Sequence, residues 1–238
     1  MFYEPARSPY DWKFQLGPIP VRVHPWFWLL SVFLGLGGNG GAREILAWVA
    51  VVFVSILVHE LGHALAMQIY GIHSRIVLYS FGGLTISDFR PRLRWFDNVF
   101  ISFAGPLAGF LFLGLVLILF SLTGNPQVWE LVPGVFGLGQ IVLVVNPAIT
   151  RLLLDLIFVN MLWGIFNLLP IFPLDGGQIT REFFQWLSPY RGFHWALSVS
   201  MVTAIVFAVF FLSTRQYFAA IMFGMLAMSN RQMMRMYP

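Results

Sequence analysis

Apolar residues along this chain gather in long, nearly unbroken runs. Four of these runs hold 18 or more residues with few charges: 45–70, 99–122, 152–169 and 195–213. That is the length a helix needs to cross the hydrocarbon core of a bilayer. Two shorter runs, 26–36 and 216–229, complete the set, and the first must tilt or borrow the glycine-rich segment 37–41 to span. The pattern predicts an all-α polytopic membrane protein with about six transmembrane helices.

Short stretches between the runs predict strands. They occur as two pairs, 12–16 with 21–23 and 75–81 with 84–89. A Gly- and Pro-rich turn separates the first pair, and Gly82-Gly83, which is typical of a hairpin turn, separates the second. We therefore expect a small membrane-associated β-sheet, built from surface strands in 1–24 and a β-hairpin region in 71–98.

Two other segments fit neither pattern. Residues 123–150 are apolar but are broken by several Pro and Gly residues, which predicts an interfacial or partly re-entrant loop. Residues 178–187 mix apolar and charged positions and predict an amphipathic helix at the membrane surface.

The composition agrees with a chain whose solvent is largely lipid. Apolar residues make up 58% of it and charged residues only 10%, with a mean hydropathy of +0.78, whereas soluble domains carry about 25% charged residues. The chain has no Cys, so disulfides and thiolate zinc sites are excluded and any metal must be held by His, Asp or Glu. The net charge of +4 comes from scattered residues and not from a basic stripe, so no nucleic-acid partner is expected.

The basic residues predict an orientation. If both termini are cytoplasmic, the inner segments hold eleven Lys and Arg residues, and the outer segments hold only Arg43, Arg151 and Arg215. Cytoplasmic loops carry an excess of Lys and Arg. We therefore expect a multi-pass protein of the cell membrane with both termini in the cytoplasm.

One motif carries chemistry. Residues 59–63 read His-Glu-Leu-Gly-His, an H-E-x-x-H pattern inside the run 45–70. On a helix, His59 and His63 share one face, where both imidazoles can reach a single zinc ion, and Glu60 can accept a proton from an attacking water. A carboxylate within a membrane span is costly and usually marks a functional site. The motif therefore predicts a zinc site.

Two imidazoles do not complete such a site, because a catalytic zinc generally has three protein ligands. Asp175 is the favoured third ligand, since Pro173 and the Gly176-Gly177 pair break the helix around it and can aim its short side chain sideways. Glu182 is the alternative, as in H-E-x-x-H proteases whose third ligand is a Glu on a later helix. Asp175 could also simply cap the helix expected from residue 178.

These residues resemble the site-2 protease family of intramembrane zinc metalloproteases. The resemblance rests on H-E-L-G-H at 59–63 within a span, Gly82-Gly83 in the following hairpin, and N-L-L-P at 167–170 leading into P-L-D-G-G at 173–177. It extends from about residue 21 to residue 187, and the last two spans match only in hydropathy. Gln178 stands where the family often has Arg.

The resemblance implies one Zn²⁺ per chain, bound by His59, His63 and Asp175. It implies that Glu60 is the catalytic base and that Asn167 assists at the scissile carbonyl. The expected activity is endopeptidase cleavage within the transmembrane segments of membrane-protein substrates, in the cytoplasmic half of the bilayer.

The residues themselves suggest how a substrate could bind. The hairpin at 75–89 could take up an unwound substrate segment as an added strand. Gly82 and Gly83 would then let the two backbones approach, although a plain tight turn explains the pair equally well.

The resemblance also suggests a domain organisation. We expect 1–238 to be one integral-membrane metalloprotease domain with 45–70, 99–122 and 152–177 as core helices and two C-terminal spans in 195–229. We expect no room for the PDZ or nucleotide-sensing modules that some family members carry.

A different class of function stays open at this stage. The chain could be a metal carrier, or a membrane scaffold that binds zinc without catalysis. A carrier should show polar residues on several spans, whereas here Asn160 and Asn167 share one face of the fourth. A scaffold would not need Glu60, which is present.

Overall fold

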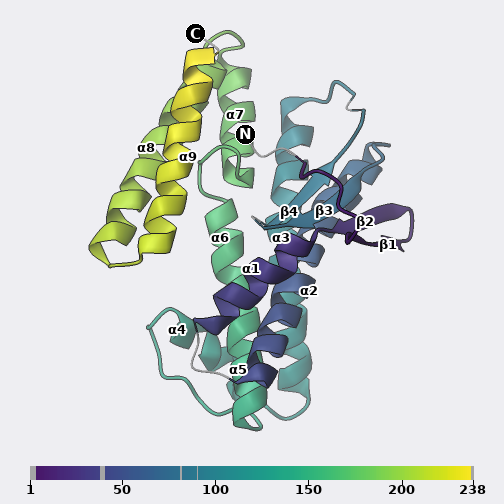
Figure 1. Cartoon of the computed structure of the whole chain (residues 1–238), viewed down its shortest axis with the longest axis vertical. Coiled ribbons are helices and arrows are strands. Elements are labelled where there is room, and N and C mark those ends of the chain that lie inside the picture. The colour runs from purple at the N-terminus through teal and green to yellow at the C-terminus, as the bar shows by residue number, and fades with distance from the viewer. Residues whose placement is uncertain (1–3, 38–40, 81, 90, 237–238) are drawn as a thin grey trace. The chain divides into compact units, whose positions relative to one another are not determined.

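The computed structural model describes residues 4–37, 41–80, 82–89 and 91–236 (Figure 1). Within these ranges the chain forms two compact units. We call the first the sheet unit, which comprises 4–91 and 104–164, and the second the helical unit, which comprises 92–103 and 165–236. The glycine-rich 38–40 and Phe81, on which two of the sequence expectations partly fall, lie outside the described residues.

The sheet unit contains one sheet of four strands in the order β1-β2-β3-β4. The strands are β1 (Trp12–Leu16), β2 (Ile19–Val23), β3 (Arg75–Tyr79) and β4 (Gly82–Ile86). The outer pairs are antiparallel, whereas β2 and β3 run parallel. Nearly all residues of the two central strands are buried, and Val21, Val23, Ile76 and Leu78 belong to the apolar core. The sheet is thus anchored by its middle, and β4 forms one edge.

The second strand pair differs from its predicted form. Gly82 and Gly83 open β4, where they pair with Tyr79 and Leu78, so the prediction that they form the turn itself is wrong. Gly82 has a φ of +118°, which side-chain-bearing residues rarely adopt. The glycine pair that suggested a turn therefore belongs to the edge of the sheet.

Ion pairs tie the chain before β1 to the sheet. Arg22 contacts Asp11 and Glu4 at 2.9 Å, and Arg75 contacts Glu4 at 3.0 Å. Burial alone would raise the pKa of Asp11, but the hydrogen bonds and charge of Arg22 outweigh it and hold this pKa below its ordinary value. These pairs fix the surface strands beside β3.

The helices of the sheet unit carry its membrane character. They are α1 (Pro25–Leu36), α2 (Ala42–Ile69), the later part of α3 (Trp95–Leu122), η1 (Pro126–Glu130), α4 (Leu131–Val135), α5 (Pro147–Ile157) and the π-helical η2 (Phe158–Trp163). The side chain of His24 caps α1 and that of Asn146 caps α5. Apolar residues of α2 pack on the inner face of the sheet to form the core.

The helical unit is dominated by its last two helices. It includes α6 (Gly164–Asn167) from Ile165 on, α7 (Asp175–Leu187), α8 (Gly192–Ser213) and α9 (Tyr217–Met236). Phe211 and Phe223 stack at 5.5 Å within the core between α8 and α9. Much of the α8 surface is apolar and exposed, as expected for a helix in lipid. Its exposed apolar residues include Trp195, Val202, Ile205, Val206, Val209, Phe210 and Leu212.

Four helical stretches in the described residues are long and apolar enough to cross a membrane: Ala42–Ile69, Trp95–Leu122, Pro147–Asn167 and Gly192–Ser213. The remaining two of the six predicted spans are helical but less suited to crossing. Helix α1 has 12 residues, about 18 Å, and α9 ends with Arg231 and Arg235. The protein is an integral membrane protein with a small sheet, as the sequence predicts.

Two further segments refine the sequence expectations. The region 123–150 contains η1, α4 and the start of α5, so it is more helical than the expected loop. The helix expected from residue 178 begins at Asp175 instead, with Leu174 as its N-cap. The fourth run is helical as far as Asn167, and the chain then turns before α7, in the segment where Pro and Gly residues predict a break.

Candidate metal centre

The H-E-x-x-H residues converge on one buried face of α2. His59, Glu60 and His63 are exposed by only 6%, 5% and 8%, and their possible ligand atoms lie within 4.8 Å of one another. The Nε2 atoms of the two histidines are 3.2 Å apart. Two nitrogens bound tetrahedrally to zinc at about 2.0 to 2.1 Å would be separated by roughly 3.3 Å. The pair thus fits a zinc ion in both donor type and spacing.

A close approach of two helices makes room for the imidazoles. A methyl group on Gly105 of α3 would overlap the His63 ring, and one on Gly62 would overlap the backbone of Ala104. Gly105 thus lets α3 pack directly against a histidine of the motif. Any larger residue at position 105 would displace that imidazole.

Strand β4 supports Glu60. The Thr85 hydroxyl lies 2.7 Å from Oε2 of Glu60 and 3.1 Å from its carbonyl oxygen, and its single proton is best donated to the nearer carboxylate. A methyl group on Gly83 would overlap the Glu60 side chain. Burial, followed by the negative charge of Glu60, raises the pKa of the neighbouring Tyr79 to about 12. Glu60 is thus held in a tightly packed, polar niche.

Sequence reasoning did not find Thr85. The signal was available, because Gly83 and Thr85 stand two apart on a strand and so face the same side. Once Gly83 is placed against Glu60, its i+2 neighbour must face the same carboxylate.

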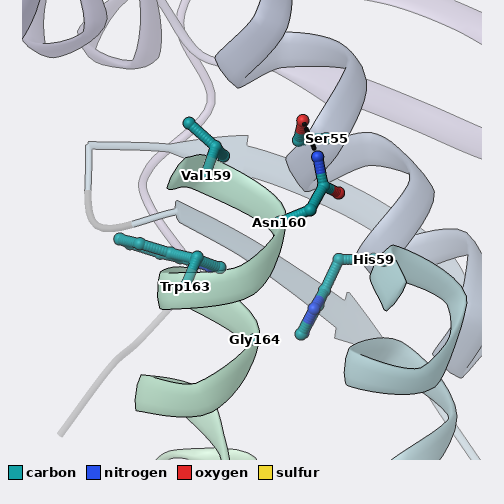
Figure 2. A pocket seen from close by; sticks show the side chains of 7 residues that line it. Ser55, His59, Val159, Asn160, Trp163 and Gly164 are labelled. Carbon is teal, nitrogen blue, oxygen red and sulfur yellow. Dashed lines mark hydrogen bonds between the residues drawn. The ribbon is translucent and has the colours of Figure 1, made fainter. Parts of the chain in front are cut away.

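A small cavity of about 10 Å³, enough for roughly one water molecule, is lined in part by His59 (Figure 2). Its lining residues come from α2, α3 and η2 with the residue after it: Ser55, His59, Gly109, Val159, Asn160, Trp163 and Gly164. The Asn160 amide donates to the Ser55 hydroxyl at 2.9 Å and to the Leu156 carbonyl at 2.9 Å. Asn160 therefore bridges two helices beside the motif, and it lies in a π-helical turn, a feature frequent at functional sites.

Asp175 and Asn167 belong to the helical unit, at either end of the segment 168–174. Asp175 is the first residue of α7, and Leu174 is the N-cap, so the helix for which Asp175 was the alternative cap begins at Asp175 itself. Methyl groups on Gly176 and Gly177 would overlap the backbone of residues 168–172. The D-G-G triplet thus lets the preceding loop lie directly on the first turn of α7.

Two other acidic residues, the alternative ligand Glu182 and Asp155 of α5, form ion pairs. Glu182 accepts a hydrogen bond from Asn98 at 3.0 Å and pairs with Arg181 at 2.7 Å. Asp155 pairs with Arg151 at 3.2 Å. Within the part of the chain that the structure describes, the cluster of His, Asp or Glu suited to a metal is His59, Glu60 and His63.

The fold and the site define a membrane-spanning protein with a histidine-glutamate-histidine metal group on a buried helix. The model of peptidase family M50 matches residues 47–212, and the chain belongs to this family. The resemblance to site-2 proteases that the sequence suggests is thereby confirmed.

Individual proteins that are similar to this chain support the assignment to the family. A zinc metalloprotease of Methanocaldococcus jannaschii is 32% identical over 170 residues, which cover 71% of this chain and 43% of the relative. Stage IV sporulation protein FB of Bacillus subtilis is 27% identical over 218 residues, covering 89% of this chain and 65% of the relative. The chain thus spans about two fifths of the first relative's length.

A solved structure agrees at the level of the fold. The site-2 protease from Methanocaldococcus jannaschii superposes with a TM-score of 0.60 and 24% identity, over 94% of this chain and 95% of that one.

Proposed function

We propose that this protein is an intramembrane zinc endopeptidase that hydrolyses peptide bonds in transmembrane segments of other membrane proteins. The observation that carries the proposal is the buried pair of Nε2 atoms 3.2 Å apart on α2, with the Glu60 carboxylate beside them. Membership of a peptidase family and zinc metalloprotease relatives support it.

His59, His63 and Asp175 are the proposed ligands of one Zn²⁺ ion. When bound, zinc supplies Lewis-acid chemistry: it polarises a carbonyl and makes water a stronger acid. Two imidazoles and one carboxylate form a ligand set found in catalytic zinc sites, which keep a fourth position open. Among the acidic candidates, Asp175 is preferred to Glu182 because it stands in the P-L-D-G-G segment at 173–177, on which the resemblance to site-2 proteases rests.

The protein's own groups manage the protons. Glu60 accepts the proton of the attacking water and later delivers it to the amine that leaves as the C–N bond breaks. The Thr85 hydroxyl, 2.7 Å from Oε2, fixes the rotamer of Glu60, so that its other oxygen can face the water. The Asn167 amide is proposed to donate a hydrogen bond to the substrate carbonyl oxygen as negative charge develops there.

Strand β4 is proposed to hold the substrate. Among the described strands β4 pairs only with β3, so its outer edge can add a further strand. A transmembrane helix must unwind before its peptide bonds become accessible, and an added strand satisfies the backbone groups that unwinding frees. Gly82 and Gly83 allow a close approach of backbones, and Gly83 already touches Glu60.

The location of the site supports cleavage in the inner half of the bilayer. His59 lies ten residues before the end of α2 at Ile69, about 15 Å along the axis. The surplus of basic residues in the segments that follow α2 favours the cytoplasm on that side.

Purified enzyme, incubated with a panel of single-span membrane proteins, tests the proposal. We expect cleavage products that disappear when zinc is chelated and return when zinc is restored. No zinc-dependent product from any member of the panel would favour a non-catalytic zinc scaffold or a metal carrier.

Replacing Thr85 by Val should lower turnover by about tenfold to a hundredfold, because it removes a hydrogen bond to a charged group and frees Glu60 to rotate. Thr85→Ser retains the hydroxyl and should stay near wild type. Initial cleavage rates beside zinc content are the measurement. Equal rates for the Val and Ser variants would mean that Thr85 does not orient Glu60.

A further inference from the structure

The segment 168–174, which leads into Asp175, is held by side chains of the last two helices. The Phe172 amide donates to the Ser200 hydroxyl of α8 at 3.0 Å. The Phe172 carbonyl accepts from the Asn230 amide of α9 at 2.8 Å. The backbone amide and the backbone carbonyl of Phe172 are therefore each satisfied by a side chain, one from α8 and the other from α9.

Apolar contacts hold the same point. The Ile171 side chain is fully buried in the core between α8 and α9, where it packs with Phe223. The Arg181 guanidinium lies over the Phe172 ring, 5.9 Å from its centroid. Residues 171–172 are thus held in place from several sides. We call residues 171–172 together with Ser200 and Asn230 the loop clamp.

The burial and the hydrogen bonds of the Asn230 side chain support this role. The residue is fully buried, and its side-chain oxygen has no hydrogen-bond partner among the described residues. Its amide nitrogen donates to the Phe172 carbonyl and also to the Leu226 carbonyl at 2.8 Å. A buried, unsatisfied acceptor is unfavourable, so packing alone does not account for an Asn here. The donor directed at the loop does account for it.

The loop clamp lies immediately before Asp175 in the chain, and backbone contacts connect the two. The Leu174 amide donates to the Ile171 carbonyl at 2.8 Å. Gly177 lies so close to the backbone of residues 171–172 that a methyl group there would overlap it. The first turn of α7, which begins with Asp175, therefore rests on the clamped residues, and a shift of Phe172 must move the carboxylate.

We propose that Ser200 and Asn230 are positioning residues for the third metal ligand, so that the α8–α9 pair sets the placement of Asp175. The inference rests on the proposed role of Asp175 in binding zinc. It gives a function to α9, which lies beyond the part of the chain that the M50 family model matches. Ligands held from outside in this way commonly govern metal affinity.

Four single-residue variants of the protein test the clamp. Ser200→Ala and Asn230→Leu each remove one bond to Phe172. Ser198→Ala is the control on α8, where the hydroxyl bonds the His194 carbonyl of its own helix, and Gln232→Leu is the control at an exposed position of α9. Ser200→Ala deletes a single atom and keeps the test valid if the Leu variant misfolds.

Hydrogen exchange of the metal-free protein is the first measurement. Backbone amides of 168–174 should exchange on the order of tenfold faster in the two clamp variants than in wild type or the controls. Unchanged exchange in this segment would overturn the clamp whatever the function of the protein.

Zinc affinity is the second measurement, with Asp175→Ala as reference. The clamp variants should bind zinc about 10- to 100-fold more weakly than the controls. If Asp175→Ala weakens binding and the clamp variants do not, the positioning role is wrong. If Asp175→Ala itself binds normally, the ligand assignment is wrong, and with it the positioning role.

Discussion

Replacing Glu60 by Gln is expected to lower turnover by about 10²- to 10⁴-fold or more, the range typical of a lost general base. Zinc content and folding should stay near wild type, because Gln preserves the size of the side chain and can still accept the hydrogen bond from Thr85. Zinc content measured beside the initial rate of cleavage separates the two effects.

Glu44→Gln is the matched control for this variant. Glu44 lies in the first turn of the same helix and is exposed, so its loss of charge should leave the rate unchanged. Equal rates for the Glu60 variant and wild type would remove Glu60 from the mechanism. Loss of zinc from the Glu60 variant would instead make Glu60 a ligand or a structural support.

Replacing Asp175 by Ala is expected to weaken zinc binding by more than about 100-fold, because it removes one of three protein ligands. Glu182→Ala should keep the metal, since its carboxylate is bonded to Asn98 and Arg181. Metal analysis of the purified variants decides between them.

The reverse outcome is equally informative. Zinc retained in Asp175→Ala and lost in Glu182→Ala would place the chain with proteases whose third ligand is a Glu on a later helix. Zinc retained in both would leave His59 and His63 to be completed by another group.

The features predicted correctly from the sequence are those set by local spacing. A helical repeat fixes His59 and His63 on one face whatever surrounds them, and the structure finds both buried there. Long apolar runs likewise predict helices because lipid requires every backbone group to be satisfied within the segment. Family membership follows from the same local motifs.

The features that sequence reasoning missed depend on contacts between distant segments. Thr85 reaches Glu60 across 25 positions of the chain, and Asn230 reaches Phe172 across 58. No local pattern encodes the pairing of Asn230, and the pairing of Thr85 follows only after Gly83 has been placed against Glu60. Gly82 and Gly83 show the opposite error. The pair suggested a local turn, but both residues lie in the edge strand β4, and a side chain at Gly83 would overlap Glu60.

The number of spanning helices is harder to predict from the length and hydropathy of an apolar run. Helix α1 is mostly apolar but has only 12 residues, and α9 is long enough but carries Arg231 and Arg235 near its end. Hydropathy describes each correctly as helical and apolar. Whether such a helix crosses the bilayer depends on its neighbours, which can cover its polar end or compensate for its length.

The most direct test of the central claim is mass spectrometry of the product termini from a single-span substrate, cut by the zinc-loaded enzyme in lipid vesicles. The account predicts termini within the transmembrane segment, in its cytoplasmic half, that are absent after chelation and with the Glu60→Gln enzyme. Termini found only outside the span, or formed equally without zinc, would contradict it.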